Sequence, residues 1–391
     1  METVLNRYNP WWYQEIPDQK RIARLSLELK LTQQLDNEQI IFITGLRRIG
    51  KTSLMKMMVN RLIKESGINS RNILYVSLDD YQLQKNSIIE IVDEFRKINR
   101  HKFSEKIYLF FDEVTYKNEY EIQLKNLADS HNVKIFASSS SASLLKNRKA
   151  HLTGRHFDIE VNPLTFHEFL KFRNIEILPA DNSLAEACFE DFLRTGGIPA
   201  FVLSGDPDYL RELVDDIIYK DIAVTHQVKD VRVLKDMFLL LMERAGKQLS
   251  INKIANILQI SPDTANRYLE YFADTFLIHL VSRHGKTNER ILSPKKIYSA
   301  DTGIRVLFTG LRDKGSLFEN YVYLRLRPLE PSYIYENKTE IDFYLPGKTL
   351  IEVKYHNEPL SPNQETLFNT FPCQSRIIIR NEKDIQSAFQ P

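Results

Sequence analysis

Short apolar runs alternate with amphipathic helical patterns in the first third of the chain. The runs at 40–44 (IIFIT), 72–78, 106–113 and 133–140 are rich in Ile, Val, Leu and Phe, and they predict buried strands. After the first run, Leu54, Met57, Met58 and Leu62 recur at helical spacing and predict a helix with one apolar stripe. Buried strands that alternate with helices predict an α/β fold built on a doubly wound, mostly parallel sheet.

The pattern changes after Leu164, where a polar connector (173–183, RNIEILPADNS) precedes a mainly helical stretch. Farther along, helical patterns are followed by strand-like pieces at 276–285 and 289–300, and then by a tail that mixes a helix with short strands. We therefore predict four domains: a sheet domain (1–164), a helical lid or connector (165–230), a helical domain with two strands (231–300) and a C-terminal α/β domain (301–391).

Residues 249–281 predict a helix-turn-helix. A first apolar stripe ends at a tight turn (QISPDT), and a second amphipathic helix follows with Ser261 or Asp263 as its cap. Together with the two strand-like pieces this forms a winged helix, a fold that places its second helix in the major groove of DNA. Thr264, Asn266 and Arg267 are expected to face the duplex.

Composition favours a globular protein of a reducing, cytoplasmic compartment. The 391 residues are 43% hydrophobic, and the two cysteines, Cys188 and Cys373, match neither a disulfide framework nor a zinc spacing. The N-terminus lacks the features of a signal peptide, and the longest apolar runs are too short to cross a bilayer, so no membrane association is expected.

Charge is nearly balanced overall, with 53 basic and 51 acidic residues, so a nucleic-acid surface must be local. Residues 247–298 hold eight basic and four acidic side chains, a local charge of +4. Basic residues gather around the predicted wing at Arg283, Lys286, Arg290, Lys295 and Lys296. That arrangement suits contacts with DNA phosphates, although winged helices also serve as protein-binding or lid modules.

Gly45, Gly50, Lys51 and Thr52 fit the G-x-x-x-x-G-K-[ST] pattern of a P-loop, between a predicted strand and a predicted helix. The glycines let backbone N–H groups wrap phosphates, the lysine reaches the outer phosphates, and the threonine offers a hydroxyl to Mg²⁺. The same stretch adds four residues to the predicted ATP contacts: Arg47, Arg48, Ile49 and Ser53.

Asp112 and Glu113 end the apolar run at 106–113, at the strand edge beside which ligands bind in such sheets. After a P-loop, Asp112 is expected to hold the magnesium and Glu113 to polarise the attacking water. The alternative is that two acids at the end of a strand only cap a loop.

The C-terminal tail carries acids and a lysine on paired strands. In TLIEVKY (349–355), Ile351, Val353 and Tyr355 fall on one face, and Glu352 and Lys354 fall on the other. Upstream, TEIDFYL places Asp342 opposite Ile341 and Phe343. If the strands pair, Asp342 and Glu352 can hold Mg²⁺ or Mn²⁺ while Lys354 activates a water for phosphodiester hydrolysis. The plain alternative is a solvated Glu–Lys pair.

This D…E-x-K pattern resembles the restriction-endonuclease-like PD-(D/E)xK nucleases. By that resemblance Glu319, on the preceding helix, would be a further metal ligand and the tail would be a DNA nuclease. A degenerate domain that binds DNA or a partner without cutting is the other interpretation.

Nearly the whole chain resembles prokaryotic AAA-type ATPases related to the signal-transducing ATPases. The resemblance rests on NPWW, GLRRIGKTSL, LFFDEV, SSSSASLL, LTGR, PLTFHEFL, TGGIPAF and EIDF…IEVKY, in the family's order. It implies that Ser138 senses the γ-phosphate, that Arg155 is an arginine finger acting in a homo-oligomer, and that Pro199 belongs to the lid near the nucleotide. The alternatives are that Arg155 is a surface arginine in a salt bridge and that Pro199 only stops a helix. This chain has Ser138-Ser139 where the family usually has Thr-Gly, which retains the hydroxyl.

The predicted function is therefore ATP hydrolysis with Mg²⁺, coupled to a DNA-engaging winged helix and a metal-dependent nuclease-like domain. Two alternatives remain: an ATP-gated DNA- or protein-binding switch whose nuclease-like domain is inactive, and an assembly protein whose winged helix contacts another chain.

Overall fold

A computed structural model describes residues 1–391 except 16–21, 143–151, 153, 357 and 390–391. The chain divides into two compact units, Met1–Asn162 (unit 1) and Pro163–Pro391 (unit 2). No helix within the described ranges is both long and apolar enough to cross a membrane.

Unit 1 is built on a five-stranded sheet in the order β2-β3-β4-β1-β5, with every neighbouring pair parallel. The strands are β1 (Ile40–Thr44), β2 (Ile73–Ser77), β3 (Ile107–Asp112), β4 (Val133–Ser139) and β5 (His156–Glu160). The first four lie at the predicted apolar runs and are buried on both faces, as a parallel sheet covered by helices requires. The predicted doubly wound α/β sheet is thus present.

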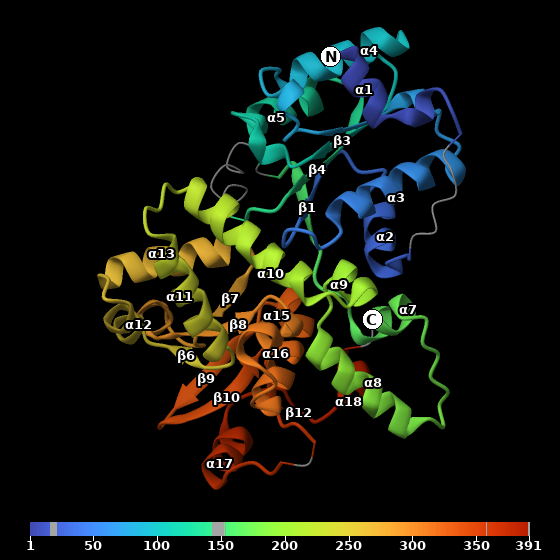
Figure 1. Ribbon diagram of the computed structural model, residues 1–391. Coiled ribbons are helices and arrows are strands. Elements are labelled where there is room, and N and C mark those ends of the chain that lie inside the picture. The colour runs from blue at the N-terminus through green and yellow to red at the C-terminus, as the bar shows by residue number, and fades with distance from the viewer. Residues whose placement is uncertain (16–21, 143–151, 153, 357, 390–391) are drawn as a thin grey trace. The chain divides into compact units, whose positions relative to one another are not determined.

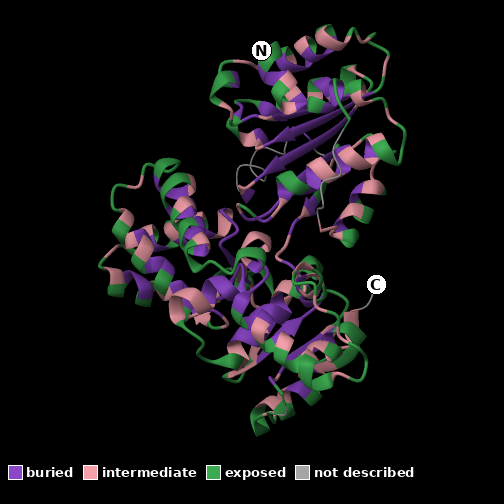
Figure 2. Ribbon diagram, turned by 45° about the vertical axis from the view of Figure 1, so that its right-hand side comes forward, coloured by how far each residue is buried: buried purple, intermediate pink, exposed green. Residues whose placement is uncertain are grey.

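Helices cover both faces of this sheet (Figure 1). They are α1 (Glu2–Tyr8), α2 (Leu25–Thr32), α3 (Lys51–Lys64), α4 (Ile88–Asn99) and α5 (Tyr120–Ser130), with short 3₁₀ turns η1 (Pro10–Trp12), η2 (Ser70–Asn72), η3 (Tyr81–Leu83) and η4 (Val114–Tyr116). Helix α2 packs on α3, whereas α1, α4 and α5 pack together. The central strands are the most continuously buried part of the unit (Figure 2).

Unit 2 begins with helices and continues into a three-stranded antiparallel sheet. The first helices are α7 (Phe166–Phe172), α8 (Asn182–Thr195), α9 (Pro199–Ser204), α10 (Pro207–Asp216), the π-helical segment η6 (Ile217–Val224) and α11 (Val231–Glu243). Next come α12 (Ile251–Leu258) and α13 (Pro262–Asp274), followed by a three-stranded antiparallel sheet in the order β6-β8-β7. Its strands are β6 (Gln248–Leu249), β7 (Ile278–Val281) and β8 (Lys295–Ser299), with α14 (Thr287–Leu292) between the last two.

The C-terminal part of unit 2 contains a four-stranded sheet in the order β12-β11-β10-β9. The elements are α15 (Thr302–Thr309), α16 (Lys314–Leu326), η7 (Arg327–Leu329), β9 (Ser332–Glu336), β10 (Thr339–Tyr344), β11 (Thr349–Val353), α17 (Pro362–Thr370), β12 (Ser375–Ile379) and α18 (Glu382–Phe389). As predicted, β10 and β11 pair as an antiparallel hairpin, and β11 pairs in parallel with β12.

One hydrophobic core joins segments of unit 2 that are far apart in the sequence. Phe189 and Phe192 of α8 pack edge-to-face on Tyr321 of α16, and the same cluster includes Tyr298 of β8 and Phe343 of β10. The predicted lid, winged helix and C-terminal domain therefore share buried side chains.

Candidate functional site

The loop between β1 and α3 has the backbone conformation that a phosphate cradle needs. Gly45 has φ +141° and Gly50 has φ +105°, both in the region that favours glycine. A Cβ on Gly45 would lie 2.5 Å from the carbonyl oxygen of Val161, so a side chain has no room there. Helix α3 begins directly at Lys51, so its first N–H groups are available to an anion.

Lys51 and Glu113 face each other at this loop. The Lys51 ammonium is 5% exposed, donates to the carbonyl oxygens of Gly45 and Leu46 at 3.1 Å each, and lies 3.9 Å from a Glu113 carboxylate oxygen. Burial raises the pKa of Glu113, and the Lys51 charge opposes that rise. The lysine therefore favours the ionised form of the carboxylate, which is the form a base requires.

Asp112 is buried at the end of β3 and accepts three side-chain hydrogen bonds. The donors are the Thr52 hydroxyl at 2.5 Å, the Tyr75 hydroxyl at 2.7 Å and the Ser138 hydroxyl. Ser138 Oγ also accepts from the Glu113 backbone N–H at 3.0 Å. Strand β4 lies between β1 and β3, which brings Ser138 between the P-loop and the two acids.

The remaining predicted nucleotide residues lie in or beside the loop. Ile49 is buried, Arg47 is half-buried, and Arg48 and Ser53 are exposed. Arg48 has φ +59° and Glu113 has φ +52°, so two non-glycine residues of this region adopt the left-handed conformation. Such conformations cost on the order of 1–3 kcal/mol and persist where the surrounding structure imposes them, often at functional sites.

Sequence reasoning missed two residues of this constellation. Tyr75 of β2 binds Asp112, and burial raises the pKa of its phenol. Ser140 donates through its backbone N–H and its hydroxyl to Glu113 Oε2, at 3.3 and 3.2 Å. Tyr75 lay in a predicted strand, but its contact with Asp112 depends on the register in which Ser77 of β2 pairs with Asp112 of β3, and no local sequence signal gives that register.

Arg155 of unit 1 is not in contact with the residues of the P-loop constellation described above. The Arg155 guanidinium is half-exposed and binds Asp129 at 3.0 Å. Arg155 directly precedes β5, at the amino-terminal end of the parallel strands, whereas the P-loop follows the carboxyl end of the neighbouring β1. Pro199 belongs to unit 2, where it opens α9. Part of the LTGR and SSSSASLL motifs lies outside the described residues. The roles given to Arg155 and Pro199 stay predictions.

The glycines before Pro199 have a packing role within unit 2. A Cβ on Gly197 would lie 2.5 Å from the Leu164 carbonyl oxygen, and one on Gly196 would lie 2.1 Å from an Asp301 carboxylate oxygen. The other Asp301 oxygen accepts from the Gly197 N–H at 2.6 Å. Close packing therefore accounts for both glycines of the GGIP stretch.

The winged-helix residues have mixed exposure. Asn266 and Arg267 are exposed on α13, Thr264 is half-buried, and the Ser261 hydroxyl caps the helix by accepting from the Thr264 N–H. Asn266 donates to Glu270 at 3.0 Å. The solvent face of α13 thus carries both charge signs, and its own balance is not basic.

The predicted basic wing requires two corrections. The segment between β7 and β8 contains α14, and of the basic residues predicted around the wing only Lys286 and Arg290 are exposed. The Arg283 backbone forms an isolated parallel β-bridge with Tyr333 of β9, and its guanidinium lies over the ring of Tyr335. Lys296, expected to contact phosphates, is fully buried, whereas Lys295 points to the other face of β8 and is half-buried.

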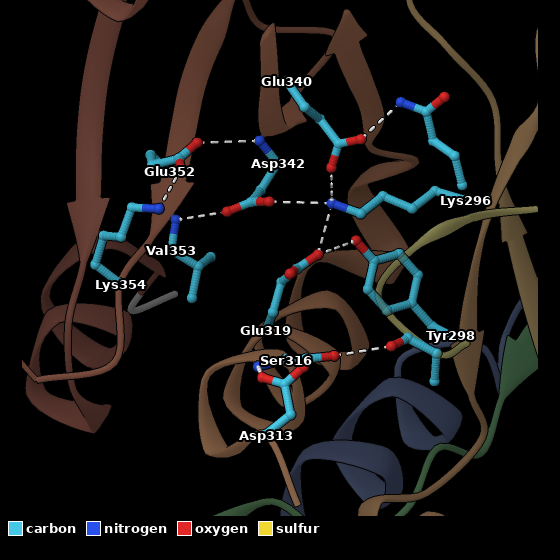
Figure 3. Close-up of polar contacts among 12 residues, drawn as sticks. Lys296, Tyr298, Asp313, Ser316, Glu319, Glu340, Asp342, Glu352, Val353 and Lys354 are labelled. Carbon is cyan, nitrogen blue, oxygen red and sulfur yellow. Dashed lines mark hydrogen bonds and ion pairs between the residues drawn. The ribbon is translucent and has the colours of Figure 1, made fainter. Parts of the chain in front are cut away.

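Two of the three carboxylates expected to hold a metal in the tail, Glu319 and Asp342, converge on an ammonium together with Glu340, which was not predicted (Figure 3). Lys296 Nζ lies 2.7 Å from Glu319, 2.5 Å from Glu340 and 3.0 Å from Asp342. Over the described part of the chain, no group of three or more His, Cys, Asp or Glu side chains is arranged to hold a metal ion. The predicted metal ligands Glu319 and Asp342 do meet, but around a lysine from β8.

A register shift explains how Asp342 reaches this lysine. The pairing of β10 with β9 shifts by one residue between Ile341 and Tyr344. Ile341 consequently packs in the core under α17 and Phe343 in the core under α16, so the prediction that both lie on one face is wrong.

Glu352 and Lys354 form the predicted pair, but it is not solvated. The two charged groups are 3.0 Å apart, and Glu352 is 1% exposed. Glu352 also accepts from the Gln364 amide at 2.9 Å and from the Asp342 backbone N–H at 3.2 Å. Burial, followed by the Asp342 charge, raises the pKa of Glu352, whereas Lys354 lowers it.

Comparison with protein families matches residues 37–170 to an AAA domain and residues 187–315 to a domain of unknown function (DUF8612). An uncharacterised protein of Methanocaldococcus jannaschii, MJ1544, is 30% identical over 373 residues, which cover 90% of this chain and 81% of the relative. An uncharacterised protein of Haemophilus influenzae is 28% identical over 320 residues, 78% of each chain. The AMPPCP-bound structure of DnaA from Aquifex aeolicus aligns with 69% of this chain and 92% of its own at 18% identity and a TM-score of 0.31.

The parallel sheet, the P-loop and the acids that end β3 define unit 1 as an ATP-binding domain of the AAA type, in agreement with the family match. The chain as a whole belongs to the family of MJ1544.

Proposed function

We propose that the chain hydrolyses ATP with Mg²⁺ in unit 1 and engages duplex DNA through the winged helix of unit 2. The observation that carries the first part is the position of Asp112 between the hydroxyls of Thr52 and Ser138, with Glu113 facing Lys51. The cradle, the ammonium and a buried carboxylate beside a hydroxyl are the groups that a phosphate–magnesium complex requires.

These residues divide the work of hydrolysis. The loop N–H groups and Lys51 would bind the phosphates, and Thr52 and Asp112 offer oxygen ligands to Mg²⁺, which neutralises charge on the transferred phosphoryl group. Glu113 would orient the attacking water and accept its proton, held in place by Ser140. Ser138 would report the state of the γ-phosphate to Asp112 and Glu113 through its two hydrogen bonds.

Arg155 lies at the end of the sheet opposite the P-loop, and this position favours a role in the nucleotide site of a neighbouring subunit. A side chain at the start of β5 is remote from the P-loop of its own chain, so we propose that it contacts the nucleotide of a neighbouring copy in a homo-oligomer. In the transition state of hydrolysis such an arginine would stabilise charge on the transferred phosphoryl group.

Glu113→Gln is the experiment that tests the assigned chemistry. The variant keeps Lys51, Thr52 and Asp112, so we expect ATP to bind normally while turnover falls by about 10²–10³-fold, the loss typical when one catalytic group is removed. ATP retained after gel filtration, measured with the rate of phosphate release, reports both quantities. Normal turnover would remove Glu113 from the mechanism. Glu119→Gln, which changes a nearby acid directly before α5, is the control and should behave as the wild type.

DNA engagement predicts a salt-dependent complex that weakens when exposed cations are lost. Replacing Arg267, Lys286 and Arg290 with alanine should lower duplex affinity and reduce the slope of log K against log salt by about 0.9 for each lost phosphate contact. Fluorescence anisotropy at several salt concentrations measures the slope. Lys295→Ala is the matched control, because its ammonium is held by Ser282 and the Arg290 carbonyl oxygen. An unaltered slope in the triple variant would favour the protein-binding alternative.

Cleavage of DNA is left out of the proposal. Metal-dependent hydrolysis needs a divalent cation between the acids, and the position between Glu319 and Asp342 is taken by Lys296. This arrangement supports the alternative in which the nuclease-like part binds without cutting.

A further inference from the structure

The Lys296 ammonium has the surroundings of a bound cation. Its three N–H groups meet three carboxylates, Glu319 from α16 and Glu340 and Asp342 from β10, each within 3.0 Å (Figure 3). An ammonium has three donors and no acceptor, so this set satisfies it completely. The carboxylates are themselves held from behind, by the Tyr298 hydroxyl, the Gln248 amide and the Val353 N–H.

The charges of the cluster exceed what one lysine neutralises. Three acids surround a single positive charge, while Glu352 is matched separately by Lys354. A buried salt bridge needs only one acid, and each further carboxylate taken from water adds a desolvation cost of several kcal/mol. Several acids from two elements around one point suit a cation of charge +2, which takes oxygen ligands at about 2.0–2.6 Å.

The lysine is fixed in place by the strand that carries it. Strand β8 pairs with β6 on one side and β7 on the other, so Lys296 lies in the middle strand of its sheet. The ammonium also lies 5.8 Å from the ring centre of Tyr298 and 5.9 Å from that of Phe343. Moving the Lys296 ammonium out of the acid cluster would disrupt both the sheet and the core. Lys296 is therefore a permanent part of the cluster and does not open or close the site.

We propose that Lys296 is a built-in replacement for a divalent cation: the wing strand β8 supplies an ammonium to the acid cluster of Glu319, Glu340 and Asp342, and thereby closes a metal site and holds unit 2 together. The C-terminal part of the chain is then a metal-free platform whose acids act structurally. The inference goes beyond ATP hydrolysis and DNA engagement, and it stands or falls without either.

Lys296→Met tests this role, because methionine keeps much of the stem and removes the charge. In nucleotide-free buffer with EDTA the full-length variant should melt several degrees below the wild type, since three closely spaced carboxylates lose their counter-ion. Adding Mn²⁺ should raise its melting temperature, following the linkage between binding and folding, and should leave the wild type unshifted. Electron paramagnetic resonance of free Mn²⁺ should count one more bound ion per chain in the variant.

Two further variants separate a metal site from a general loss of stability. Lys295→Met, one residue away and facing the other side of β8, should neither lose stability to the same extent nor gain Mn²⁺. Lys296→Met with Asp342→Asn should lose the Mn²⁺ gain. Equal Mn²⁺ binding by Lys296→Met and the wild type overturns the proposal. If Lys296→Met does not fold in either buffer, Mn²⁺ binding is compared between the wild type and Asp342→Asn. A Mn²⁺ site of the wild type that Asp342→Asn abolishes overturns the proposal, and equal Mn²⁺ binding by the two proteins supports it.

Discussion

Lys51→Ala is expected to reduce ATP turnover by about 10²–10³-fold and to weaken nucleotide binding as well, because it removes the ammonium aimed at the outer phosphates. The same substitution is also expected to impair the activation of water by Glu113. The Lys51 charge is the largest contribution that opposes the rise of the Glu113 pKa, ahead of the hydrogen bonds from Ser140, and without it burial and the Asp112 charge shift the acid toward its protonated form. A protonated Glu113 cannot accept a proton from water, so one substitution affects both phosphate binding and water activation.

This double effect distinguishes Lys51→Ala from Glu113→Gln. The residual activity of Lys51→Ala should increase as pH rises, since the raised pKa of Glu113 is then exceeded and the carboxylate ionises. Glu113→Gln has no such group and should show no such increase. Phosphate release measured from pH 6 to 9 gives the comparison, and Lys64→Ala at the far end of α3 serves as the control. Wild-type turnover in Lys51→Ala would contradict the P-loop assignment.

The strands of unit 1 could be predicted from the sequence because they are buried on both faces. β1 was predicted at its observed bounds, and β2, β3 and β4 to within a residue at each end. The fifth strand, β5, was missed, since His156 and Asp158 interrupt its apolar pattern at the edge of the sheet. Edge strands bury less surface, so hydrophobicity marks them poorly.

The nucleotide site was predictable for a related reason. Its parts follow directly from strand ends, and parallel strands bring their carboxyl ends to one edge. Lys51, Asp112, Glu113 and Ser138 are accordingly in contact, directly or through one another. The hydrogen bond from Tyr75 depends on a register between β2 and β3 that local patterns do not contain.

The acid cluster of unit 2 could not be derived from the sequence in the same way. Lys296 is 46 residues from Asp342 and follows another lysine, and a pair of adjacent lysines is usually a solvated surface feature. One signal was present: side chains alternate along a strand, so two adjacent lysines on a strand with a buried face include one that points inward. No comparable feature of the sequence predicts the bulge that redirects Asp342, because the bulge depends on how β10 pairs with β9.

The hydrogen bonds of Asp301 also join residues that are far apart in the sequence, and we expect their loss to have a large effect on the stability of the protein. Asp301 is 1% exposed at the start of α15, where one carboxylate oxygen accepts from Gly197 at 2.6 Å and the other from Ile304 at 3.1 Å. The carboxylate thereby fastens the GGIP stretch to α15. In Asp301→Ala these buried N–H groups lose their acceptors, at about 1–3 kcal/mol for each.

We therefore expect Asp301→Ala to lower the free energy of unfolding by roughly 3–4 kcal/mol, measured by urea unfolding. Asp313→Ala is the matched control: Asp313 caps α16 in the same way but is half-exposed, so its loss should cost about 1 kcal/mol.

The effect of Asp301→Ala should also depend on pH, in a direction that follows from the pKa of the acid. Burial, only partly offset by backbone hydrogen bonds, raises the pKa of Asp301 to about 6 from a usual value of 3.8. Between these values the native state binds a proton that the unfolded chain has released, so this contribution to stability is present at low pH and is lost as pH rises through about 6. The difference between wild type and Asp301→Ala should accordingly be larger at pH 5 than at pH 7.5. A difference that grows with pH would show instead that the ionised carboxylate is favoured by its hydrogen bonds over the protonated form.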